Sequence, residues 1–328
     1  MKLKDIHCCP STLKEGHHSY STNALKRVFM GRKVSHVLPY ESPAANDVAD
    51  ILFEENRMRI SISGVQEKFS VLLEKNKLRL TKYGEQGDYI LKPIPNMGKN
   101  SDMMPANEHL TMQIARQVFN IETAENALIF FSNGDPAYIT KRFDVDAEGN
   151  KRAQEDFASI AQRTPQTHGE NYKYLGNYYE LLELLKKYVP AYNVEAPKLF
   201  KLILFNYLFS NGDAHFKNFS LVQTEFGDYK LSPAYDLLNS RMHIPDNDFA
   251  LEEGLLPATY AKGNVHEQFY ALGELAGINA KSINSIFSLL TSKKAEVLSL
   301  ISRSFLSESL KRNYEQSYLT RLNKFTRQ

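Results

Sequence analysis

Short runs in which hydrophobic and polar residues alternate occupy much of the chain between about residue 60 and residue 143. Such runs, bounded by turn-forming residues, are typical of β-strands. The predicted strands are residues 69–73, 78–81, 88–92, 127–131 and 137–143. The last two flank Asn133-Gly134, a dipeptide that favours a tight hairpin turn. Between the third and fourth strands, Leu110, Ile114 and Val118 recur at helical spacing and predict a helix over 104–119.

Beyond Asp144 the apolar residues follow a helical period for most of the chain. The helices predicted there are about 154–163, 177–189, 196–210, 265–275, 280–289 and 292–324. A hairpin over 219–231, turning at residues 226–228, interrupts them. We therefore expect an α+β protein with a small β-rich lobe followed by a larger helical lobe. The expected parts are an irregular N-terminal extension packed on the small lobe (1–59), the small lobe itself (60–143) and the helical lobe (144–328).

The composition supports a packed, two-lobed protein. Of 328 residues, 42% are hydrophobic and 24% are charged, which excludes wholesale disorder. The formal net charge of +2 disfavours a protein whose main task is to neutralise nucleic-acid phosphates. Lys and Arg outnumber Glu over 291–328, and we interpret this tail as a solvated helix face in preference to a surface for an acidic partner.

Cysteine usage and hydropathy place the chain in the cytoplasm. Cys8 and Cys9 are adjacent and cannot staple a chain of this size, which favours an intracellular protein. A metal site combining them with the neighbouring histidines is disfavoured, because the spacing matches no structural zinc pattern. The first sixteen residues lack the apolar core of a signal peptide, and the longest apolar stretch, 199–209, is too short to span a bilayer.

The segment from Ser210 to Ser220 carries the most specific chemistry. Its opening pentapeptide, Phe-Ser-Asn-Gly-Asp at 209–213, also occurs at 131–135, where it is explained as a hairpin turn. Only the second copy continues into His-x-Lys-Asn. Asp213 and Asn218 have the spacing of the proton-accepting Asp and the metal-binding Asn of a kinase catalytic loop, and Asp236 follows a predicted hairpin as a second metal ligand. A polar loop that merely caps the preceding helix is the alternative.

Upstream residues complete a nucleotide site. Lys92 ends a predicted strand and Glu108 lies on the next helix, an arrangement with which kinases orient phosphates. The join at 141–143 is the expected hinge that receives adenine through backbone groups. No G-x-G-x-x-G loop or Walker A motif is present, so residues 61–68, with the single Gly64, are the candidate phosphate-covering loop.

Together these segments resemble the HipA-like serine/threonine kinases of bacterial toxin–antitoxin systems. The matching motifs are Ser-Gly-Val-Gln-Glu-Lys (63–68), Ile-Leu-Lys-Pro (90–93), Asn-Glu-His-Leu-Thr-Met (107–112), Lys-Arg-Phe-Asp (141–144), Asn-Gly-Asp-Ala-His-Phe-Lys-Asn-Phe-Ser (211–220) and Tyr-Asp-Leu-Leu (235–238). The resemblance implies a bilobal kinase-like fold and phosphorylation of a protein serine or threonine with ATP and Mg²⁺.

The resemblance assigns roles by position. Asp213 is the implied catalytic base, and Asn218 and Asp236 are the implied Mg²⁺ ligands. The residues implied to contact nucleotide are Ser63, Gly64, Val65, Gln66, Glu67, Lys68, Lys92, Glu108, Lys141, Arg142, Phe143, His215, Lys217, Asn218, Tyr235 and Asp236. Ser61 or Ser63 falls where family members autophosphorylate and silence themselves, which fits the repulsion between added phosphate and the nucleotide.

Partners follow from the same resemblance. It implies an aminoacyl-tRNA synthetase as protein substrate and a helix-turn-helix antitoxin as neutralising partner, with DNA reached only through that antitoxin. Because only about sixty residues precede the Ser61 loop, the chain looks closer to the short HipT-type kinases, and a small separate protein is then a third partner. Two other readings remain open: a small-molecule phosphotransferase of kinase fold, and a non-catalytic corepressor that supports a DNA-bound antitoxin.

Overall fold

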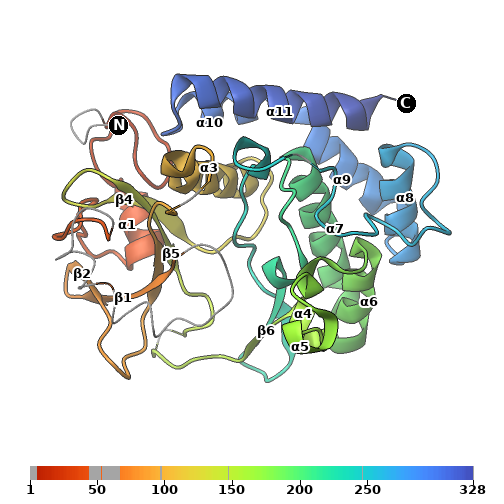
Figure 1. The fold of residues 1–328 in the computed structure, drawn as a ribbon, viewed down its shortest axis with the longest axis horizontal. Coiled ribbons are helices and arrows are strands. Elements are labelled where there is room, and N and C mark those ends of the chain that lie inside the picture. The colour runs from red at the N-terminus through yellow and green to blue at the C-terminus, as the bar shows by residue number, and fades with distance from the viewer. Residues whose placement is uncertain are drawn as a thin grey trace.

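A five-stranded antiparallel sheet forms the small lobe (Figure 1). The computed structural model describes residues 6–43, 53, 67–96, 98–146, 148–245 and 247–327. The strands are β1 (Phe69–Glu74), β2 (Lys77–Leu80), β3 (Tyr89–Lys92), β4 (Asn126–Phe130) and β5 (Pro136–Lys141), arranged in the order β2-β1-β3-β5-β4. All five predicted strands are therefore present.

Alternate residues of the central strands pack on two different layers. Ala127 and Ile129 of β4 join a core that includes helix α1 (Thr22–Phe29), whereas Leu128 joins the core of helix α3 (Met104–Gln117). Side chains of successive strand residues point to opposite faces, so α1 and α3 cover opposite sides of the sheet. This double covering explains why every residue of β4 is buried.

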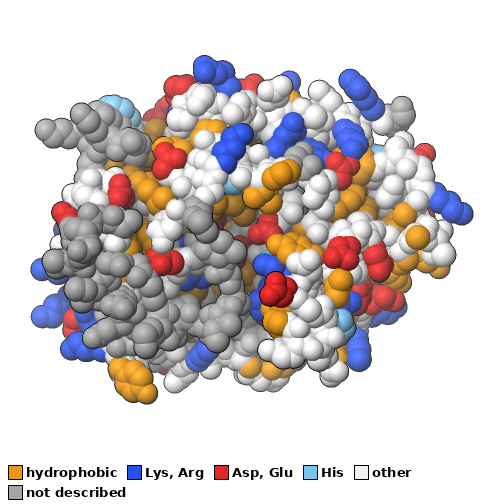
Figure 2. All heavy atoms as spheres, viewed as in Figure 1, with side chains coloured by type: hydrophobic (Ala, Val, Ile, Leu, Met, Phe, Trp, Pro, Cys, Tyr) orange, Lys and Arg blue, Asp and Glu red, His pale blue; other side chains and the backbone are white. Residues whose placement is uncertain are grey.

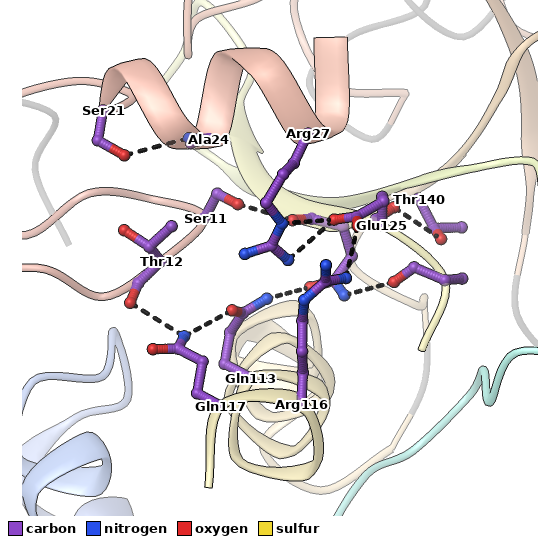
Figure 3. Close-up of polar contacts among 12 residues, drawn as sticks. Ser11, Thr12, Ser21, Ala24, Arg27, Gln113, Arg116, Gln117, Glu125 and Thr140 are labelled. Carbon is purple, nitrogen blue, oxygen red and sulfur yellow. Dashed lines mark hydrogen bonds and ion pairs between the residues drawn. The ribbon is translucent and has the colours of Figure 1, made fainter. Parts of the chain in front are cut away.

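The N-terminal segment is held to the rest of the small lobe by polar contacts as well (Figure 3). Arg27 of α1 and Arg116 of α3 both pair with Glu125 at the start of β4, at 2.9 and 2.6 Å. The side-chain amide of Gln117 donates to the Thr12 carbonyl at 3.1 Å. The prediction that this region is irregular missed α1, whose eight residues are too few to show a clear helical period, although the cap at Ser21, which accepts from the Ala24 N–H, was a usable signal.

The large lobe is built around α7, which is buried along most of its length. Its elements are β6 (Gln154–Asp156), α4 (Phe157–Ile160), α5 (Pro165–His168), α6 (Tyr178–Tyr188), α7 (Tyr192–Leu208), β7 (Ser220–Gln223), β8 (Tyr229–Leu231), α8 (Val265–Leu275), α9 (Ala280–Ser292), α10 (Lys294–Ser302) and α11 (Glu308–Thr326). Strands β6, β7 and β8 form a small antiparallel sheet next to the loop that carries Asp213 and Asn218. No helix in the described part of the chain is long and apolar enough to cross a membrane. The prediction of an α+β fold in two lobes is confirmed.

Two predicted helices are wrong in part. The segment 154–163 begins as strand β6, because the Asp156 side chain accepts from the Ser159 N–H and so fixes the start of α4 after itself. The single helix predicted over 292–324 is two helices with a break at residues 303–307. There the Ser304 hydroxyl donates back to the Ile301 carbonyl at 2.7 Å, and Ser307 begins the new helix.

The basic C-terminal region is not a uniformly basic face. In the space-filling view, blue and red side chains are interspersed along the upper edge, where Figure 1 places α10 and α11 (Figure 2). Lys293 pairs with Glu296 and Lys311 with Glu308. Arg321, which belongs to the tail that was expected to be solvated, is only 3% exposed. Most of the tail is thus a solvated face as expected, and Arg321 is the exception.

Candidate active site

A buried lysine at the end of β3 connects the small lobe to the loop that carries Asp236. The Lys92 ammonium donates to Glu108 Oε1 of α3 at 2.7 Å and also to Asp236 Oδ1. The Lys92 and Glu108 side chains are 4% and 3% exposed, whereas Asp236 keeps 26% of its side-chain surface exposed. Lys68 approaches the other Asp236 oxygen at 3.7 Å. The structure therefore brings together three residues that are far apart in sequence and that the sequence analysis selected.

The charges in this cluster shift one another's pKa. Burial acts to lower the pKa of Lys92, but the carboxylates of Asp236 and Glu108 outweigh it and raise that pKa. Burial raises the pKa of Glu108 above its usual range. Burial also acts to raise the pKa of Asp236, yet Lys92 and Lys68 lower it well below its usual range. Asp236 is therefore ionised at neutral pH and can accept a cation from the solvent side.

Backbone pairing with the small lobe fixes the position of Asp236. The Ala124 N–H donates to the Ala234 carbonyl at 2.9 Å, and the Ala234 N–H donates to the Glu122 carbonyl at 2.8 Å. Asp236 itself has φ 54°, a left-handed conformation that is uncommon for a residue with a side chain. The predicted hairpin, β7–β8, lies between Asn218 and Asp236 and returns the chain to this point.

Helix α3 is locked to the loop that follows Asp236. The side-chain amide of Asn107, which is completely buried, donates to the Asn239 carbonyl at 2.9 Å. In return the Asn239 N–H donates to Asn107 Oδ1 at 3.1 Å. Because Glu108 is the next residue on α3, this pair of hydrogen bonds sets the position of both partners of Lys92.

Asp213 lies in the loop that follows α7, and its side chain is 43% exposed. The Tyr174 hydroxyl donates to Asp213 Oδ1 at 2.6 Å, which orients the carboxylate. His215 Nε2 lies 3.9 Å from the same oxygen, and burial lowers the pKa of His215 to about 4, so this ring is neutral at pH 7. One carboxylate oxygen thus has a fixed donor, while the group as a whole remains accessible to a substrate.

Asn218 closes the loop that Asp213 opens. The Asn218 Oδ1 atom accepts from the His215 N–H at 3.1 Å, and the Asn218 N–H donates to the His215 carbonyl at 2.9 Å. These two bonds hold the loop between the two sequence-predicted residues in a short 3₁₀ turn. A carbonyl oxygen has two lone pairs, so Asn218 Oδ1 keeps one for another ligand.

Further along, the loop contacts the connection between the lobes. Lys217 pairs with Asp156 at 2.8 Å, and its carbonyl accepts from the Tyr235 hydroxyl at 2.9 Å. The Tyr235 ring stacks on Phe143, with 5.7 Å between ring centroids. Phe143, Lys217 and Tyr235 therefore lie together, as expected for residues that share one site.

Two backbone donors of the expected hinge are already engaged. The Lys141 N–H donates to the Glu125 carbonyl at 2.7 Å, and the Arg142 N–H donates to the Asp88 carbonyl at 2.8 Å. The Arg142 side chain pairs with Asp144. Lys141 and Arg142 can therefore recognise adenine through their backbone carbonyl groups but not through their backbone N–H groups.

The predicted phosphate-covering loop is described only at its end. Ser61, Ser63, Gly64, Val65 and Gln66 lie outside the described residues. Glu67 and Lys68 are described, and Lys68 faces Asp236.

Two residues of the site escaped the sequence analysis, and a third, Asn107, was part of a quoted motif but received no role. Tyr174 and Asp156 support Asp213 and Lys217 from a distant part of the chain, and Asn107 positions α3. Nothing local marks Tyr174 or Asp156, because each acts through a partner about 40 to 60 residues away. Asn107 precedes Glu108 directly, and a polar residue on the buried side of a helix was a usable signal.

The residues present fit a magnesium ion held together with phosphates. Within the described ranges, no three His, Cys, Asp or Glu side chains gather as a self-sufficient metal site. Mg²⁺ in phosphoryl-transfer sites takes one or two protein oxygen ligands and completes its shell with water and phosphate. The ionised, half-buried Asp236 and the Asn218 amide oxygen are ligands of that kind.

The chain folds into a β-rich lobe and a helical lobe. Lys92 at the end of a small-lobe strand pairs with Glu108 on a helix, and the loop with Asp213 and Asn218 comes from the helical lobe. These features define a protein-kinase-like fold. Residues 60–297 match the HipA-like C-terminal domain family, and the chain belongs to that family. It is 26% identical over 279 residues to a Haemophilus influenzae protein named "Putative kinase", covering 77% of this chain and 78% of that protein.

Other similar proteins agree with this assignment. The chain is 30% identical over 225 residues to the Sinorhizobium fredii "Putative kinase Y4dM", covering 64% of this chain and about half (52%) of that relative. Among solved structures it resembles HipA of Shewanella oneidensis, determined with HipB and operator DNA, with a TM-score of 0.61, 20% identity and coverage of 81% and 65%. It also resembles the Helicobacter pylori proinflammatory kinase CtkA, with a TM-score of 0.52, 14% identity and coverage of 77% and 92%. These two likenesses establish the fold.

Proposed function

We propose that the protein is an ATP- and Mg²⁺-dependent kinase that phosphorylates a serine or threonine of a protein. The observation that carries this proposal is the buried contact of Lys92 with both Glu108 and Asp236. A lysine held in this way places a fixed positive charge beside the carboxylate that is best suited to a metal ion. Family membership and relatives named as kinases support the same reading.

Each residue has a distinct task in this mechanism. Asp213, oriented by the Tyr174 hydroxyl, accepts the proton of the acceptor hydroxyl as that oxygen attacks the γ-phosphorus; the bond to the β–γ bridging oxygen breaks and ADP leaves. Lys92 binds the nucleotide phosphates and Glu108 keeps its ammonium in place. Asn218 and Asp236 would hold Mg²⁺, which supplies charge that neutralises the transferring group. Phe143, Lys217 and Tyr235 form the neighbouring wall of the nucleotide site.

The biological setting is also a proposal. The structure likeness to a HipA that was solved with HipB and operator DNA supports a toxin role here, with a helix-turn-helix antitoxin as partner. Autophosphorylation at Ser61 or Ser63, an aminoacyl-tRNA synthetase substrate, a third small partner as in HipT-type systems and a cytoplasmic location complete the proposal. The proposal also includes the division of the chain into an N-terminal extension, a small lobe and a helical lobe, with boundaries at residues 59 and 143.

The twin pentapeptide provides a matched test. Purified wild type, Asp213→Asn and Asp135→Asn proteins are incubated with Mg²⁺-ATP and followed by intact-mass spectrometry with phosphosite mapping. Asp135 occupies the same place in the first copy of the pentapeptide, where its carboxylate accepts from Ser42 Oγ at 2.6 Å in a turn. We expect the wild type and Asp135→Asn to gain about 80 Da per phosphate, and Asp213→Asn to gain none.

The starting mass decides how a null result is interpreted. A wild type that is phosphorylated as purified, beside an unmodified Asp213→Asn protein, supports a kinase that has silenced itself in the cell. Equal labelling of all three proteins, or unmodified and inert wild type, would contradict the proposed kinase activity. An unmodified and inert wild type would favour the alternative of a non-catalytic corepressor. Transfer of phosphate to small amines or alcohols, without labelling of protein, would favour a small-molecule phosphotransferase.

A further inference from the structure

Helix α7 ends in a conformation that usually requires glycine. The Ser210 N–H donates to the Tyr207 carbonyl and the Asn211 N–H donates to the Asn206 carbonyl, the two bonds of a Schellman motif. The residue at the turn of this motif adopts a left-handed backbone, and here it is Ser210, with φ 51°. A side chain disfavours that backbone, so the serine at this position calls for a compensating contact.

The compensating contacts come from α11. The Ser317 hydroxyl donates to Ser210 Oγ at 2.9 Å, and Arg321 Nε donates to the same oxygen at 3.3 Å. From the Asp236 side, the Ser240 N–H and the Ser240 hydroxyl both donate to the Ser210 carbonyl, each at 3.1 Å. Ser210 is 2% exposed, so these bonds form out of contact with water. A glycine would satisfy the backbone but would lose every bond from α11.

Arg321 is a rigid support for this contact. Its guanidinium pairs with Asp248, donates to the Asn247 carbonyl at 3.0 Å and lies over the Tyr207 ring at 5.0 Å. A buried guanidinium with fixed partners loses little freedom when it makes a further bond. The loop from 247 to 248, the end of α7 and α11 are therefore joined at one point.

Helix α11 also contacts helix α3 and the loop that follows Asp236. Tyr314 of α11 and Thr111 of α3 share a hydrogen bond of 2.8 Å. The side-chain amide of Asn239, in the loop after Asp236, donates to Ser317 Oγ at 3.1 Å. Figure 1 shows α11 lying across α3 and α7. Yet α11 lies beyond residues 60–297, the part of the chain that matches the family.

We propose that α11 sets the position of Asp213 by fixing Ser210 three residues before it, which makes Ser210 and Arg321 positioning residues for phosphoryl transfer. The inference rests on the proposed kinase activity and adds Ser210 and Arg321 to the residues on which that activity depends. Proton transfer to Asp213 depends on sub-ångström placement of the carboxylate, so a loosened loop lowers kcat. Nucleotide binding through Lys92 and Asp236 does not depend on the Ser210 hydroxyl.

Ser210→Gly is the decisive variant, because glycine favours the left-handed backbone and does not threaten the fold. We expect kcat to fall about tenfold or more and the Kd for ATP to stay unchanged. The thermal midpoint should change little, because the relief of the left-handed backbone offsets the two lost hydrogen bonds. Arg321→Met is expected to lower kcat similarly while also lowering stability. Lys324→Ala is the matched control: Lys324 also pairs with Asp248 but does not contact Ser210, and its kcat should equal that of the wild type.

Hydrogen exchange of the amides at 211–214 provides a readout that needs no activity. We expect faster exchange there in Ser210→Gly and Arg321→Met and wild-type exchange in Lys324→Ala. Wild-type kcat and wild-type exchange in Ser210→Gly would overturn the inference. If the wild type transfers no phosphate, the proposed kinase activity fails, and the exchange comparison alone decides whether α11 orders the loop.

Discussion

Lys92 Nζ and Glu108 Oε1 lie 2.7 Å apart in a site where both side chains are almost fully excluded from water. Two hydrogen bonds between Asn107 and Asn239 hold the glutamate's helix against the loop of Asp236. The lysine therefore meets two carboxylates whose separation is fixed by the protein. A preorganised charge of this kind does not need to be rearranged when phosphate arrives.

Replacing Lys92 with methionine should remove this charge while keeping most of the side-chain volume. We expect kcat/KM for ATP to fall about 10²- to 10³-fold, the loss typical of one electrostatic contact to a reacting group. Lys198, a half-exposed residue of α7 that pairs with the buried Glu195 at the same 2.7 Å, provides the control as Lys198→Met. Initial rates over a range of ATP concentrations give kcat/KM for Lys92→Met and for Lys198→Met. A Lys92→Met protein with wild-type kcat/KM would mean that nucleotide binds elsewhere.

Removing the Tyr174 hydroxyl should free the Asp213 carboxylate to rotate. Tyr174→Phe is expected to lower kcat about tenfold and to leave the ATP Kd unchanged, because only the orientation of the base is lost. Steady-state kinetics and nucleotide titration separate these two effects. A rise in kcat would instead show that the hydroxyl blocks the acceptor position on Asp213.

Asn107→Leu should test the lock between α3 and the Asp236 loop. The substitution leaves the buried Asn239 N–H without its partner and the Asn239 carbonyl with only the Met242 N–H at 3.3 Å, which costs about 2–4 kcal/mol in the free energy of unfolding. Urea denaturation measures this loss. Asn323→Leu, at an exposed position on α11, is the control and should change stability little. Equal losses in the two variants would contradict the assigned role of Asn107.

His109 should make the folded state sensitive to acid. It is fully buried on α3, its Nε2–H donates to the Ser11 carbonyl at 2.9 Å, and burial lowers its pKa to about 4 from an ordinary value of 6.5. Between these values the unfolded chain binds a proton that the folded chain does not, so stability is lost as the pH falls from about 6.5 towards 4. The loss between pH 7 and pH 5 is about 2 kcal/mol.

His109→Gln keeps a donor for the Ser11 carbonyl and removes the titration. Denaturation curves at pH 7 and pH 5 should show a drop in stability that is smaller by about 2 kcal/mol in this variant than in the wild type. An identical drop in both proteins would assign the acid sensitivity to other groups.

The two copies of Phe-Ser-Asn-Gly-Asp show what local sequence can decide. At 131–135 the left-handed residue is Gly134, and the chain turns into β5. At 209–213 the left-handed residue is Ser210, and the chain leaves a helix for the Asp213 loop. Five identical residues thus adopt two conformations, because β4 precedes one copy and the buried helix α7 precedes the other.

The strands, the order of the lobes and the cluster of Lys92, Glu108 and Asp236 were predictable, since each depends on local pattern or on motif order. The break between α10 and α11, helix α1 and the contact of Tyr174 with Asp213 were not. Helix α1 is too short to show a clear period, and the break between α10 and α11 depends on the local hydrogen bond of Ser304 and the helix start at Ser307, which an apolar period does not report. Only the contact of Tyr174 with Asp213 joins segments that are distant in sequence.

Residues 234–240 make backbone or side-chain bonds to the entry of β4, to α3 and to the Ser210 loop. Neither lobe can unfold while these bonds persist, and breaking them exposes the buried surfaces of both. Calorimetry should therefore record one cooperative transition, in which the calorimetric and van't Hoff enthalpies agree, in place of separate melting of a β-rich part and a helical part. A destabilising substitution in either lobe then lowers the melting temperature of the whole molecule.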